Sequence, residues 1–474
     1  MRLSPLVTLV VFATALGAQT PERALTSGDI TAADMRRRIE IIADDSMAGR
    51  STPGPGLERA ARYVEREFAR LGLRPAGDGG GYVQRWGLSR LAADPEASSI
   101  EIIGNGLRIP IRLGVDARLI GGAIDGRVID AAVSGPDDPR RSGRVVVLPV
   151  DYGRPLPPDL QQHVDEVAAT AAAVIILSNR DSATFAMRLE SAARPPLTPD
   201  FRRARAGAPV LEIHRRALGP AAGDAFDRAV IQLVPRYHSR ATAPNLVGIL
   251  EGRDPALREE FVAISAHIDA VGIRPGAADS ILNGSDDNAS GVAALLEIAE
   301  LLSPLEARPR RSVLFLVPSG EEPGLWGSDF FVSHPTVPLD RIVADLNMDL
   351  IGRNWSDSVI VVGPELSSLG ETLRAVERAH PELRMGSIAD RWPEERIFYR
   401  SDHYHFARRG VPVLFFTSGT HPDYHQPTDT PDRLDPEKAS RVARLVHRVA
   451  AAVADAAERP RWLPEGSRRI AEEK

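Results

Sequence analysis

The chain has 474 residues, of which 43% are hydrophobic and 26% are charged, and its net charge is −6. This length exceeds one ordinary hydrophobic core, so two domains are expected. The mild acidity and the lack of long one-sign charge runs argue against a nucleic-acid partner. There are no cysteines, which excludes disulfides, thiol catalysis and cysteine metal ligands. Any zinc must therefore be bound by histidine and carboxylate.

The first residues have the composition of a signal peptide. Arg2 precedes an apolar run from Leu6 to Leu16, and small residues follow up to Ala18. The run is shorter than the roughly 20 apolar residues that span a bilayer, and no later segment is long and apolar enough to do so. We expect residues 1–18 to be removed on export, and the mature protein to be secreted or periplasmic without stable membrane insertion. An uncleaved anchor is the alternative interpretation.

Two helices are predicted after this leader, at Met35–Ala43 and Leu57–Leu71. In the second, apolar residues recur every three or four positions, which places them on one face. Met47–Gly56, between the two helices, is rich in glycine and proline and is predicted to be a loop.

The pattern of predicted secondary structure changes between residues 112 and 238. Short β-type runs alternate there with turn signals and with one alanine-rich helical stretch near 160–171. The β-type runs are Arg127–Asp130, Arg144–Pro149, Ala173–Leu177 and Pro209–Glu212. Because no histidine or carboxylate cluster stands out, we interpret 112–238 as an inserted, non-catalytic, β-rich domain. It separates two parts of a catalytic domain, 22–111 and 239–460, and residues 461–474 form a tail.

The later half alternates buried-type strands with helices. Strands are predicted at Asn245–Leu250, Phe261–Ala266, Ser312–Pro318, Arg341–Asn347, Val359–Val362 and Val411–Thr417. Helices are predicted at Ala289–Leu302, Leu325–Ser333, Ser367–Ala379 and Pro436–Ala457. This alternation favours an α/β layered fold with a largely parallel sheet, in which ligands gather beyond the carboxyl ends of the strands.

Histidines and carboxylates occur at several of those strand ends. His267 and Asp269 follow Phe261–Ala266, and a carboxylate two residues after a histidine can orient its ring. Asp286 lies in Asn283-Gly-Ser-Asp-Asp-Asn-Ala-Ser-Gly291, where one aspartate suffices to cap a helix. Two adjacent aspartates exceed what capping needs. We predict that Asp286 bridges two cations.

Two further strand ends carry acidic residues. Glu321 and Glu322 are neighbours on a glycine-flanked turn and repel each other unless a cation or a proton lies between them. We assign Glu322 to metal binding and Glu321 to proton abstraction from water. Asp349 follows Arg341–Asn347 between residues typical of a core, where solvation explains a carboxylate poorly.

The last strand end carries a histidine and a tyrosine. His425 lies in Asp423-Tyr-His-Gln-Pro-Thr-Asp-Thr430, and Tyr424 beside it could donate a hydrogen bond to an oxyanion. Each residue alone has a structural explanation. Together, five histidine and carboxylate candidates follow four strands of one predicted sheet. They match a zinc pair with a shared carboxylate, which activates water between ions about 3.5–4 Å apart.

The order and spelling of these motifs resemble the two-zinc aminopeptidase and glutamate-carboxypeptidase family, the zinc exopeptidases of the aminopeptidase Y type. The resemblance covers nearly all of residues 35–105 and 240–457, and the inserted segment resembles a protease-associated domain. It implies the zinc-exopeptidase fold, a three-layer α/β/α arrangement with a mostly parallel central sheet.

The resemblance also implies roles for the site residues. His267 and Asp349 would bind one Zn²⁺, Glu322 and His425 the other, and Asp286 would bridge them. Glu321 would be the base, and Asp269 would orient His267.

The other histidines near these motifs are weaker candidates for metal ligands. His403 and His405 match a family segment near the substrate pocket, and we interpret them as pocket or helix residues because the ligand set is already complete. His421 lies four residues before His425 and could touch the site. The remaining histidines lie away from strand ends and are interpreted as structural.

The sequence thus predicts an exported metallo-exopeptidase that acts on peptides or small amino-acyl substrates. Aminopeptidase activity is favoured, chiefly from the resemblance. A carboxypeptidase is the alternative, because Arg353, Arg391, Arg396 and Arg400 could bind a substrate carboxylate. A single-zinc cyclase and a non-enzymatic binding protein are further rivals. The complete ligand set disfavours the former, and the retained base disfavours the latter.

Overall fold

The computed structural model describes residues 29–154, 156–203, 207–219 and 226–471. The predicted signal segment, residues 1–18, lies outside them and stays a prediction. Among the described residues, no helix combines the length and hydropathy needed to cross a membrane.

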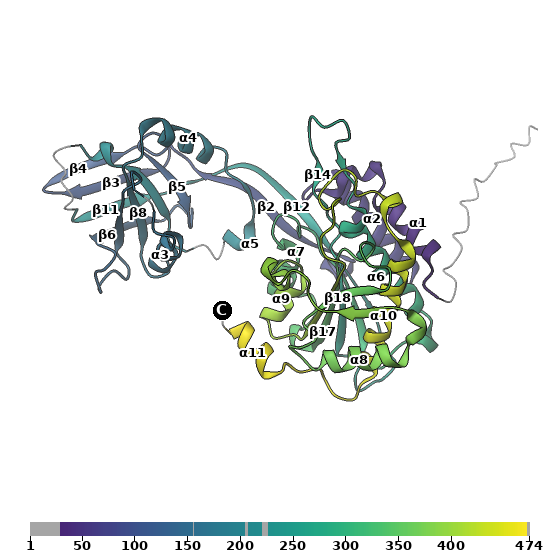
Figure 1. Ribbon diagram of the computed structural model, residues 1–474. Coiled ribbons are helices and arrows are strands. Elements are labelled where there is room, and N and C mark those ends of the chain that lie inside the picture. The colour runs from purple at the N-terminus through teal and green to yellow at the C-terminus, as the bar shows by residue number, and fades with distance from the viewer. Residues whose placement is uncertain (1–28, 155, 204–206, 220–225, 472–474) are drawn as a thin grey trace, which may run out of the picture.

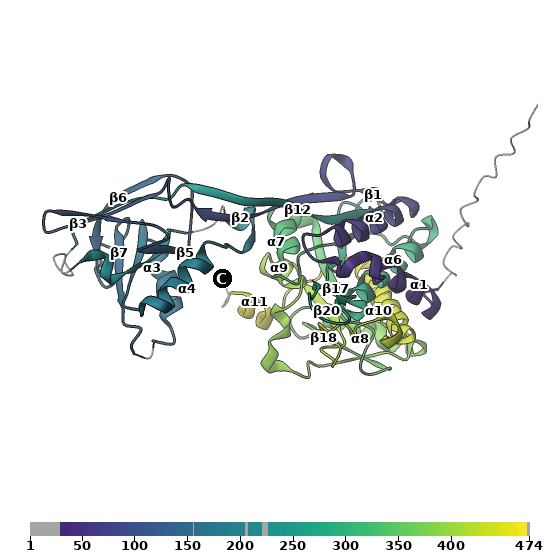
Figure 2. The ribbon, with the colours of Figure 1, turned by 90° about the horizontal axis from the view of Figure 1, so that it is seen from above.

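The larger of two units, here called the main domain, is a ten-stranded sheet between layers of helices (Figures 1 and 2). The strands lie in the order β19-β18-β20-β17-β13-β16-β12-β2-β9, and β1 pairs with β12. Their bounds are β1 (Arg74–Pro75), β2 (Val83–Ala93), β9 (Leu197–Pro199), β12 (Pro235–Leu250), β13 (Phe261–Ser265), β16 (Ser312–Val317), β17 (Ile342–Met348), β18 (Ser358–Val362), β19 (Gly386–Ile388) and β20 (Val413–Thr417).

The centre of this sheet is parallel. β13 lies between β16 and β17, and β17 pairs with β20, all in parallel register. β12, β2 and β9 add antiparallel pairings on one side, and β18 is antiparallel to β20 on the other. The carboxyl ends of the four central strands therefore meet at one edge, as the sequence predicted. The expected α/β fold is confirmed.

Helices cover both faces of the sheet. α1, α2, α6 and α10 share one apolar core with it, whereas α7 and α9 bury their apolar residues against the other face. The bounds of the main-domain helices are α1 (Ala32–Ile42), α2 (Pro55–Arg70), α6 (Gly291–Leu302), α7 (Trp326–Ser333), α8 (Leu369–Ala379), α9 (His403–Arg408), α10 (Pro436–Asp455) and α11 (Pro464–Ala471). The segment predicted as a tail thus contains α11.

Local sequence signals explain where the long helices begin. α10 starts at Pro436, and Asp435 before it accepts hydrogen bonds from the backbone N–H groups of Glu437 and Lys438. α2 likewise starts with a proline, and its buried stripe includes Val64 and Phe68. Gly248 of β12 lies under this stripe, where a Cβ atom would come within 2.9 Å of the Phe68 ring. The glycine lets α2 approach the sheet closely.

The second unit, here called the inserted domain, has its own eight-stranded sheet, in the order β4-β3-β11-β6-β7-β8-β10-β5. Its elements are β3 (Ser99–Gly104), β4 (Leu107–Ile111), β5 (Ala117–Gly121), β6 (Val128–Ser134), β7 (Val145–Val150), α3 (Leu160–Ala168), β8 (Ala173–Ser178), α4 (Ser182–Ala192), β10 (Val210–His214) and β11 (Arg228–Gln232). α3 covers a second small core of this domain.

The predicted boundary at residue 112 needs a correction. β3 and β4 lie before it, yet β3 pairs with β11 and β4 pairs with β3, so both belong to the inserted domain's sheet. The error arose because short strands before residue 112 carry no signal that distinguishes one sheet from another. The resemblance of this domain to protease-associated domains stays a prediction.

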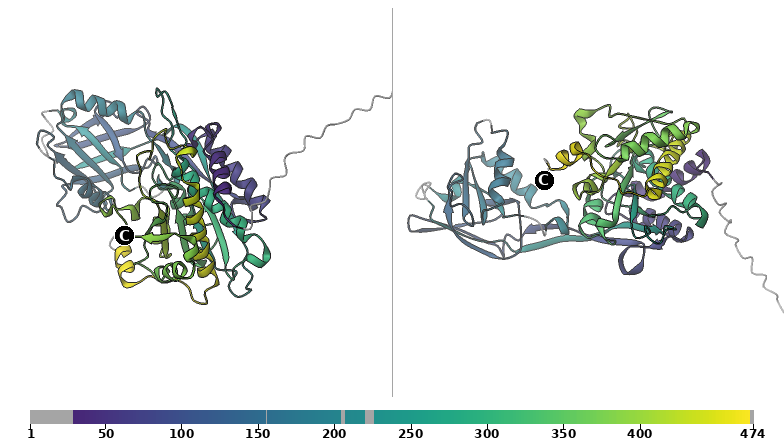
Figure 3. Two further views of the ribbon diagram at one scale, coloured as in Figure 1. Left: turned by 45° about the vertical axis from the view of Figure 1, so that its right-hand side comes forward. Right: turned by 90° about the horizontal axis from the view of Figure 1, so that it is seen from below.

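Two long antiparallel strands join the domains. β2 and β12 pair from Val83 with Leu246 to Ala93 with Pro235, and they run from one sheet to the other (Figure 3). The short helix α5 (Asp200–Arg203) lies beside them. From α5, the Arg202 guanidinium donates to the Asp329 carboxylate of α7 at 2.7 Å and to the Gly324 carbonyl at 3.0 Å. The segment that leaves the inserted domain is thereby fixed to the main domain.

Candidate metal centre

The predicted site residues gather at the carboxyl edge of the parallel strands. His267 follows β13, Glu321 and Glu322 follow β16, Asp349 follows β17, and His425 lies beyond β20. The loop before α6 reaches the same place because α6 starts close to the end of β17. At Gly291, the first residue of α6, a Cβ atom would come within 2.7 Å of the Met348 carbonyl oxygen.

Two groups of side chains there could each hold a metal ion. His267, Asp287 and Asp349 form a buried group, and Asp287, Glu322 and His425 form a second. Nε2 of His267 lies 3.3 Å from Oδ1 of Asp287 and 3.2 Å from Oδ1 of Asp349. Nε2 of His425 lies 3.1 Å from Oδ2 of Asp287 and 2.9 Å from Oε2 of Glu322. The two groups therefore share one carboxylate, with one oxygen directed to each.

The shared carboxylate is Asp287, which corrects the choice of Asp286. The backbone at Asp287 leaves the helical region, with φ −106° and ψ 91°, so the two successive side chains point in different directions. Oδ1 of Asp286 accepts a hydrogen bond from the Gly352 backbone N–H, and its Oδ2 lies 3.3 Å from Nε2 of His421. The sequence pair Asp-Asp indicated the loop but did not distinguish its two carboxylates. His421 touches Asp286 rather than either ligand group.

The charges in this site shift one another's pKa. Burial lowers the pKa of His267, but the carboxylates of Asp349 and Glu321 outweigh it and raise this pKa well above its usual value. Burial raises the pKa of Glu322 to about 7, with the Asp287 charge adding to the effect. Burial also raises the pKa of Asp349. Carboxylates this close together repel each other unless cations lie between them.

Glu321 lies beside the first group without belonging to it. Its Oε2 is 3.9 Å from Nε2 of His267, and burial raises its pKa well above its usual value. The Glu321 backbone N–H donates to Oδ1 of Asp269 at 3.2 Å. Asp269 also faces His267: its backbone oxygen is 3.2 Å from Nδ1 and its carboxylate is 3.7 Å away. Asp269 thus holds both the Glu321 turn and the imidazole in place.

Tyr424 and His425 form one stacked unit. Their rings lie 3.8 Å apart at an angle of 23°. Burial and the nearby Asp287 carboxylate raise the pKa of the Tyr424 hydroxyl, so it stays a donor. His425 adopts φ 56°, which is uncommon for a non-glycine residue, and Arg274 donates to its carbonyl at 3.1 Å. Arg274 lies just after β14 (Gly272–Ile273), which pairs with β15 (Ile281–Leu282).

The sequence reasoning missed two residues that hold the loops of the site. The fully buried Arg50 donates to the carbonyl oxygens of Ile268 at 2.8 Å, Asn283 at 2.6 Å and Gly284 at 2.9 Å. It therefore ties together the loops that carry His267 and Asp287. Arg50 lies in the predicted loop 47–56, where composition gave no hint that a charged side chain would be buried.

Asp429 is the second such residue. Its carboxylate accepts hydrogen bonds from the backbone N–H of Asp286 at 3.0 Å and of Asp287 at 3.2 Å. Burial raises its pKa to about 7. Asp429 lies in the same motif as His425, four residues later, which is the only sequence signal that could have identified it.

The other predicted polar residues lie outside the two ligand groups. His403 and His405 are buried in α9, and burial lowers their pKa to about 3 and about 4. His403 stacks on Phe415 with ring centroids 4.5 Å apart. Among the arginines considered for substrate carboxylates, Arg353 pairs with Asp423 at 2.6 Å and Arg400 pairs with Glu395 at 2.6 Å.

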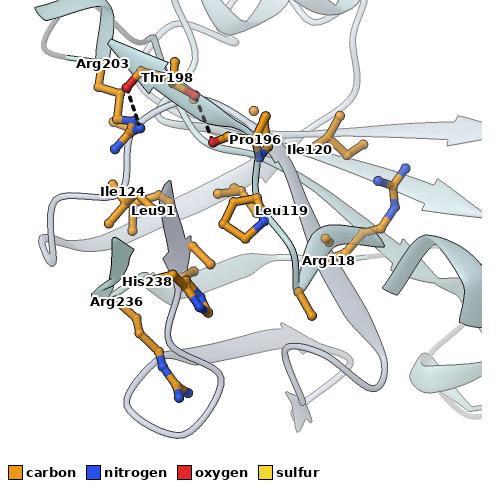
Figure 4. Close-up of a pocket in the computed structure, with 18 of the residues that line it drawn as sticks. Leu91, Arg118, Leu119, Ile120, Ile124, Pro196, Thr198, Arg203, Arg236 and His238 are labelled. Atoms are coloured by element: carbon orange, nitrogen blue, oxygen red, sulfur yellow. Dashed lines mark hydrogen bonds between the residues drawn. The ribbon is translucent and has the colours of Figure 1, made fainter. Parts of the chain in front are cut away.

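A cavity of about 1030 Å³ lies apart from these residues, between the long strands and the inserted domain (Figure 4). Its wall combines apolar side chains such as Leu119 with arginines. Arg118 pairs at 2.6 Å with Glu212, which also pairs with Arg180, and Arg203 lies 3.7 Å from Asp200. None of the residues that line the cavity belongs to either ligand group.

Part of the chain that includes this site matches a family of known proteins. Residues 245–450 match peptidase family M28. The matched segment carries both ligand groups.

Among curated proteins, the chain is similar to aminopeptidase YwaD of Bacillus subtilis, with 26% identity over 290 residues. That alignment covers 59% of this chain and 56% of the relative. A probable leucine aminopeptidase of Arthroderma otae is 29% identical over 212 residues, covering 43% of this chain and 56% of the relative. The chain thus spans just over half the length of these relatives.

Among solved structures, BSAP, a zinc aminopeptidase from Bacillus subtilis, is 19% identical, with a TM-score of 0.48. The alignment covers 90% of this chain and 95% of that chain.

The contacts of Asp429 give a testable prediction. In Asp429→Ala, compared with wild type at a pH above about 7 where the Asp429 carboxylate is ionised, the backbone N–H groups of Asp286 and Asp287 lose a charged acceptor. This loss is worth about 1.5–3 kcal/mol, or roughly 10- to 100-fold in local opening. Amide hydrogen exchange at these two positions should accelerate by that factor. Asp432→Ala, an exposed neighbour, serves as the control. Unchanged exchange in the Asp429 variant would contradict the role given to this residue.

Proposed function

We propose that this protein is a zinc-dependent exopeptidase, most specifically an aminopeptidase, that hydrolyses the N-terminal peptide bond of peptides or small amino-acyl substrates. One observation carries the proposal. Two histidine–carboxylate groups share Asp287, and the unused carboxylate of Glu321 lies next to them. The names of the aminopeptidases to which the chain is similar support the same reaction class.

The donor set fits two zinc ions. Each group offers one imidazole nitrogen and two carboxylate oxygens, which are typical zinc ligands, and a shared carboxylate suits a pair of ions. Among the described residues, the buried Oε1 of Glu322 finds no hydrogen-bond partner, so Glu322 has an oxygen available for a cation. When bound, zinc polarises a carbonyl oxygen and lowers the pKa of water.

The remaining residues would move protons and orient the substrate. The raised pKa of Glu321 suits a group that accepts a proton from the attacking water and returns it to the leaving amine. The Tyr424 hydroxyl would donate a hydrogen bond to the oxygen on which negative charge develops. Asp269 would hold the Glu321 turn and the His267 ring during both steps.

The electrostatics favour a substrate with a free amino end. The site is rich in carboxylates, which attract an ammonium group, whereas Arg353 and Arg400 are already paired with acidic residues. A protein that acts outside the cytoplasm, as the segment 1–18 predicts, would meet such peptides as nutrients or as turnover products.

Chelation tests the substrate class. After zinc removal, the purified protein should lose cleavage of amino-acyl anilides with a free amino end, and added zinc should restore it. A second substrate set with a blocked amino end and a free carboxylate should stay uncut. Zinc-restored cleavage of the second set alone would establish a carboxypeptidase instead, and cleavage of neither set would refute the exopeptidase.

Glu321→Gln tests the base. The variant keeps the shape of the side chain and all candidate ligands, so zinc content should stay at the wild-type level. Turnover should fall about 100- to 10,000-fold, the range for loss of a general base. Glu394→Gln, at an exposed position, is the matched control. Activity near wild type in Glu321→Gln would show that another group takes the proton.

A pair of neighbouring variants tests the shared ligand. Asp287→Asn leaves one oxygen where two are needed, so bound zinc should drop from two ions per chain to at most one. Asp286→Asn should keep both ions, because its carboxylate lies outside the ligand groups. Metal analysis after dialysis measures both. Loss of zinc in the Asp286 variant alone would return the bridging role to that residue.

A further inference from the structure

A row of polar side chains leads from Asp349 into the core of the main domain. Oδ2 of Asp349 accepts a hydrogen bond from the Ser401 hydroxyl at 3.0 Å, and Oγ of Ser401 lies 2.8 Å from Nδ2 of Asn347. Oδ1 of Asn347 lies 3.0 Å from Oγ of Ser265, which is 2.8 Å from Oδ1 of Asp345. Asp345 is fully buried, and the row ends there.

The fold explains why these residues meet. Asp345 and Asn347 are two positions apart on β17, so their side chains point to the same face of the sheet. Ser265 is paired with Asn347 on the neighbouring strand β13, and Ser401 lies just before α9, which covers this face. Neither ligand group includes Asp345, Ser265, Asn347 or Ser401.

If every contact in the row is a hydrogen bond, counting the available protons fixes which group donates at each step. Ser401 has one hydroxyl proton, and only by donating it to Asp349 does it make the contact at 3.0 Å with an ionised carboxylate. It must then accept from Nδ2 of Asn347, which turns Oδ1 of Asn347 toward Ser265. Ser265 has a single proton, and its contact with that oxygen is a hydrogen bond only if Ser265 donates the proton there. Its contact with Asp345 is then a hydrogen bond only if Asp345 carries a proton and donates it.

The opposite direction leaves the metal-site carboxylate without a donor. If the Asn347 amide were rotated by half a turn, Nδ2 would donate to Ser265, and Ser265 could donate to an ionised Asp345. Ser401 would then donate to the Asn347 oxygen and have no proton left for Asp349. This alternative would also place a carboxylate charge at Asp345, in the core and with no cationic partner among the residues that the structure describes, which is costly.

The surroundings of Asp345 support the neutral form. Its Oδ2 is buried and has no hydrogen-bond partner within the described part of the chain, as expected for the carbonyl oxygen of an acid in an apolar setting. Burial, together with the charge of Asp402, raises the pKa of Asp345 to about 8.

We propose that Asp345 is a protonated carboxylic acid at the head of a one-way donor chain, through Ser265, Asn347 and Ser401, that fixes the carboxylate of Asp349 for metal binding. Asp345 is a positioning residue in this chain, since it acts only through its neighbours. The effect on metal binding rests on the proposed function. The protonation of Asp345 does not, so the two can fail separately.

Infrared spectroscopy tests the protonation directly, without turnover. The spectrum of wild type minus Asp345→Asn at neutral pH should contain the C=O stretch of a carboxylic acid, above the amide I region and shifted in heavy water. A difference spectrum that contains ionised carboxylate bands instead would overturn the proposal. This result holds whether or not the protein cleaves any peptide.

Zinc affinity tests the positioning role. Asp345→Asn retains a neutral donor toward Ser265, so its zinc Kd should stay near wild type. Ser401→Ala removes the last donor and should weaken zinc binding about 10-fold or more, as is typical when a partner of a metal ligand is lost. Asp345→Val removes the carboxylic acid that begins the chain and leaves the Asn347 amide free to rotate. We therefore expect a loss of zinc affinity of the same order.

Combining the variants shows whether they break one chain. Asp345→Val with Ser401→Ala should weaken zinc binding no more than the worse single variant. Losses that multiply would contradict a connected chain, as would a wild-type zinc Kd in Asp345→Val. If Asp345→Val does not fold, Asp345→Asn and the infrared measurement still decide: zinc loss in Asp345→Asn equal to that in Ser401→Ala would refute the donor role.

Discussion

The two oxygens of Asp287 face different histidines, and much of the surrounding structure serves that arrangement. One carboxylate between His267 and His425 must come from a loop that reaches the carboxyl edge of a parallel sheet. Gly291 lets α6 begin against the end of β17, which brings this loop to the edge. Asp429 accepts from the loop's backbone N–H groups, and Arg50 donates to its carbonyl oxygens. The position of Asp287 is therefore determined by contacts outside the ligand groups.

The site also depends on unfavourable burial that a cation would relieve. Glu321, Glu322 and Asp349 each have a raised pKa because water is largely excluded from them. Protonated histidines balance part of this charge, since the pKa of His425 is raised to about 10 by its bonds to Asp287 and Glu322 despite partial burial. Divalent ions would replace those protons and satisfy the same carboxylates. The polar row behind Asp349 limits the negative charge in the same way. A neutral Asp345 can donate a hydrogen bond, whereas an ionised Asp345 would add another buried negative charge near the site.

The sequence was informative wherever periodicity and chemistry coincided. The central strands are apolar runs that end in a histidine or an acid, so both the parallel sheet and four ligand candidates, His267, Glu322, Asp349 and His425, could be predicted together. The choice between Asp286 and Asp287 could not, because it depends on the non-helical backbone at Asp287. Arg50 and Asp429 were missed for a related reason: their partners are backbone groups far away in the chain, which leave no pattern in the sequence.

In the inserted domain, too, contacts between distant parts of the chain limited what the sequence could predict. Its central strands β7 and β8 are apolar runs and were predicted, whereas β3 and β4 were assigned to the wrong domain. Strand pairing over long sequence separations decides that assignment, and β3 pairs with β11 more than a hundred residues later. The long strands β2 and β12 belong to the main sheet yet extend to the inserted domain (Figure 3), so no boundary signal in composition separates the two units.

Anomalous X-ray scattering at the zinc absorption edge, from crystals of the zinc-loaded protein, tests the central claim most directly. We predict two peaks, one bound by His267 and Asp349 and the other by Glu322 and His425, with Asp287 ligating both. A single peak, or a peak bound by Asp286 and His421, would contradict the account of a shared carboxylate at Asp287.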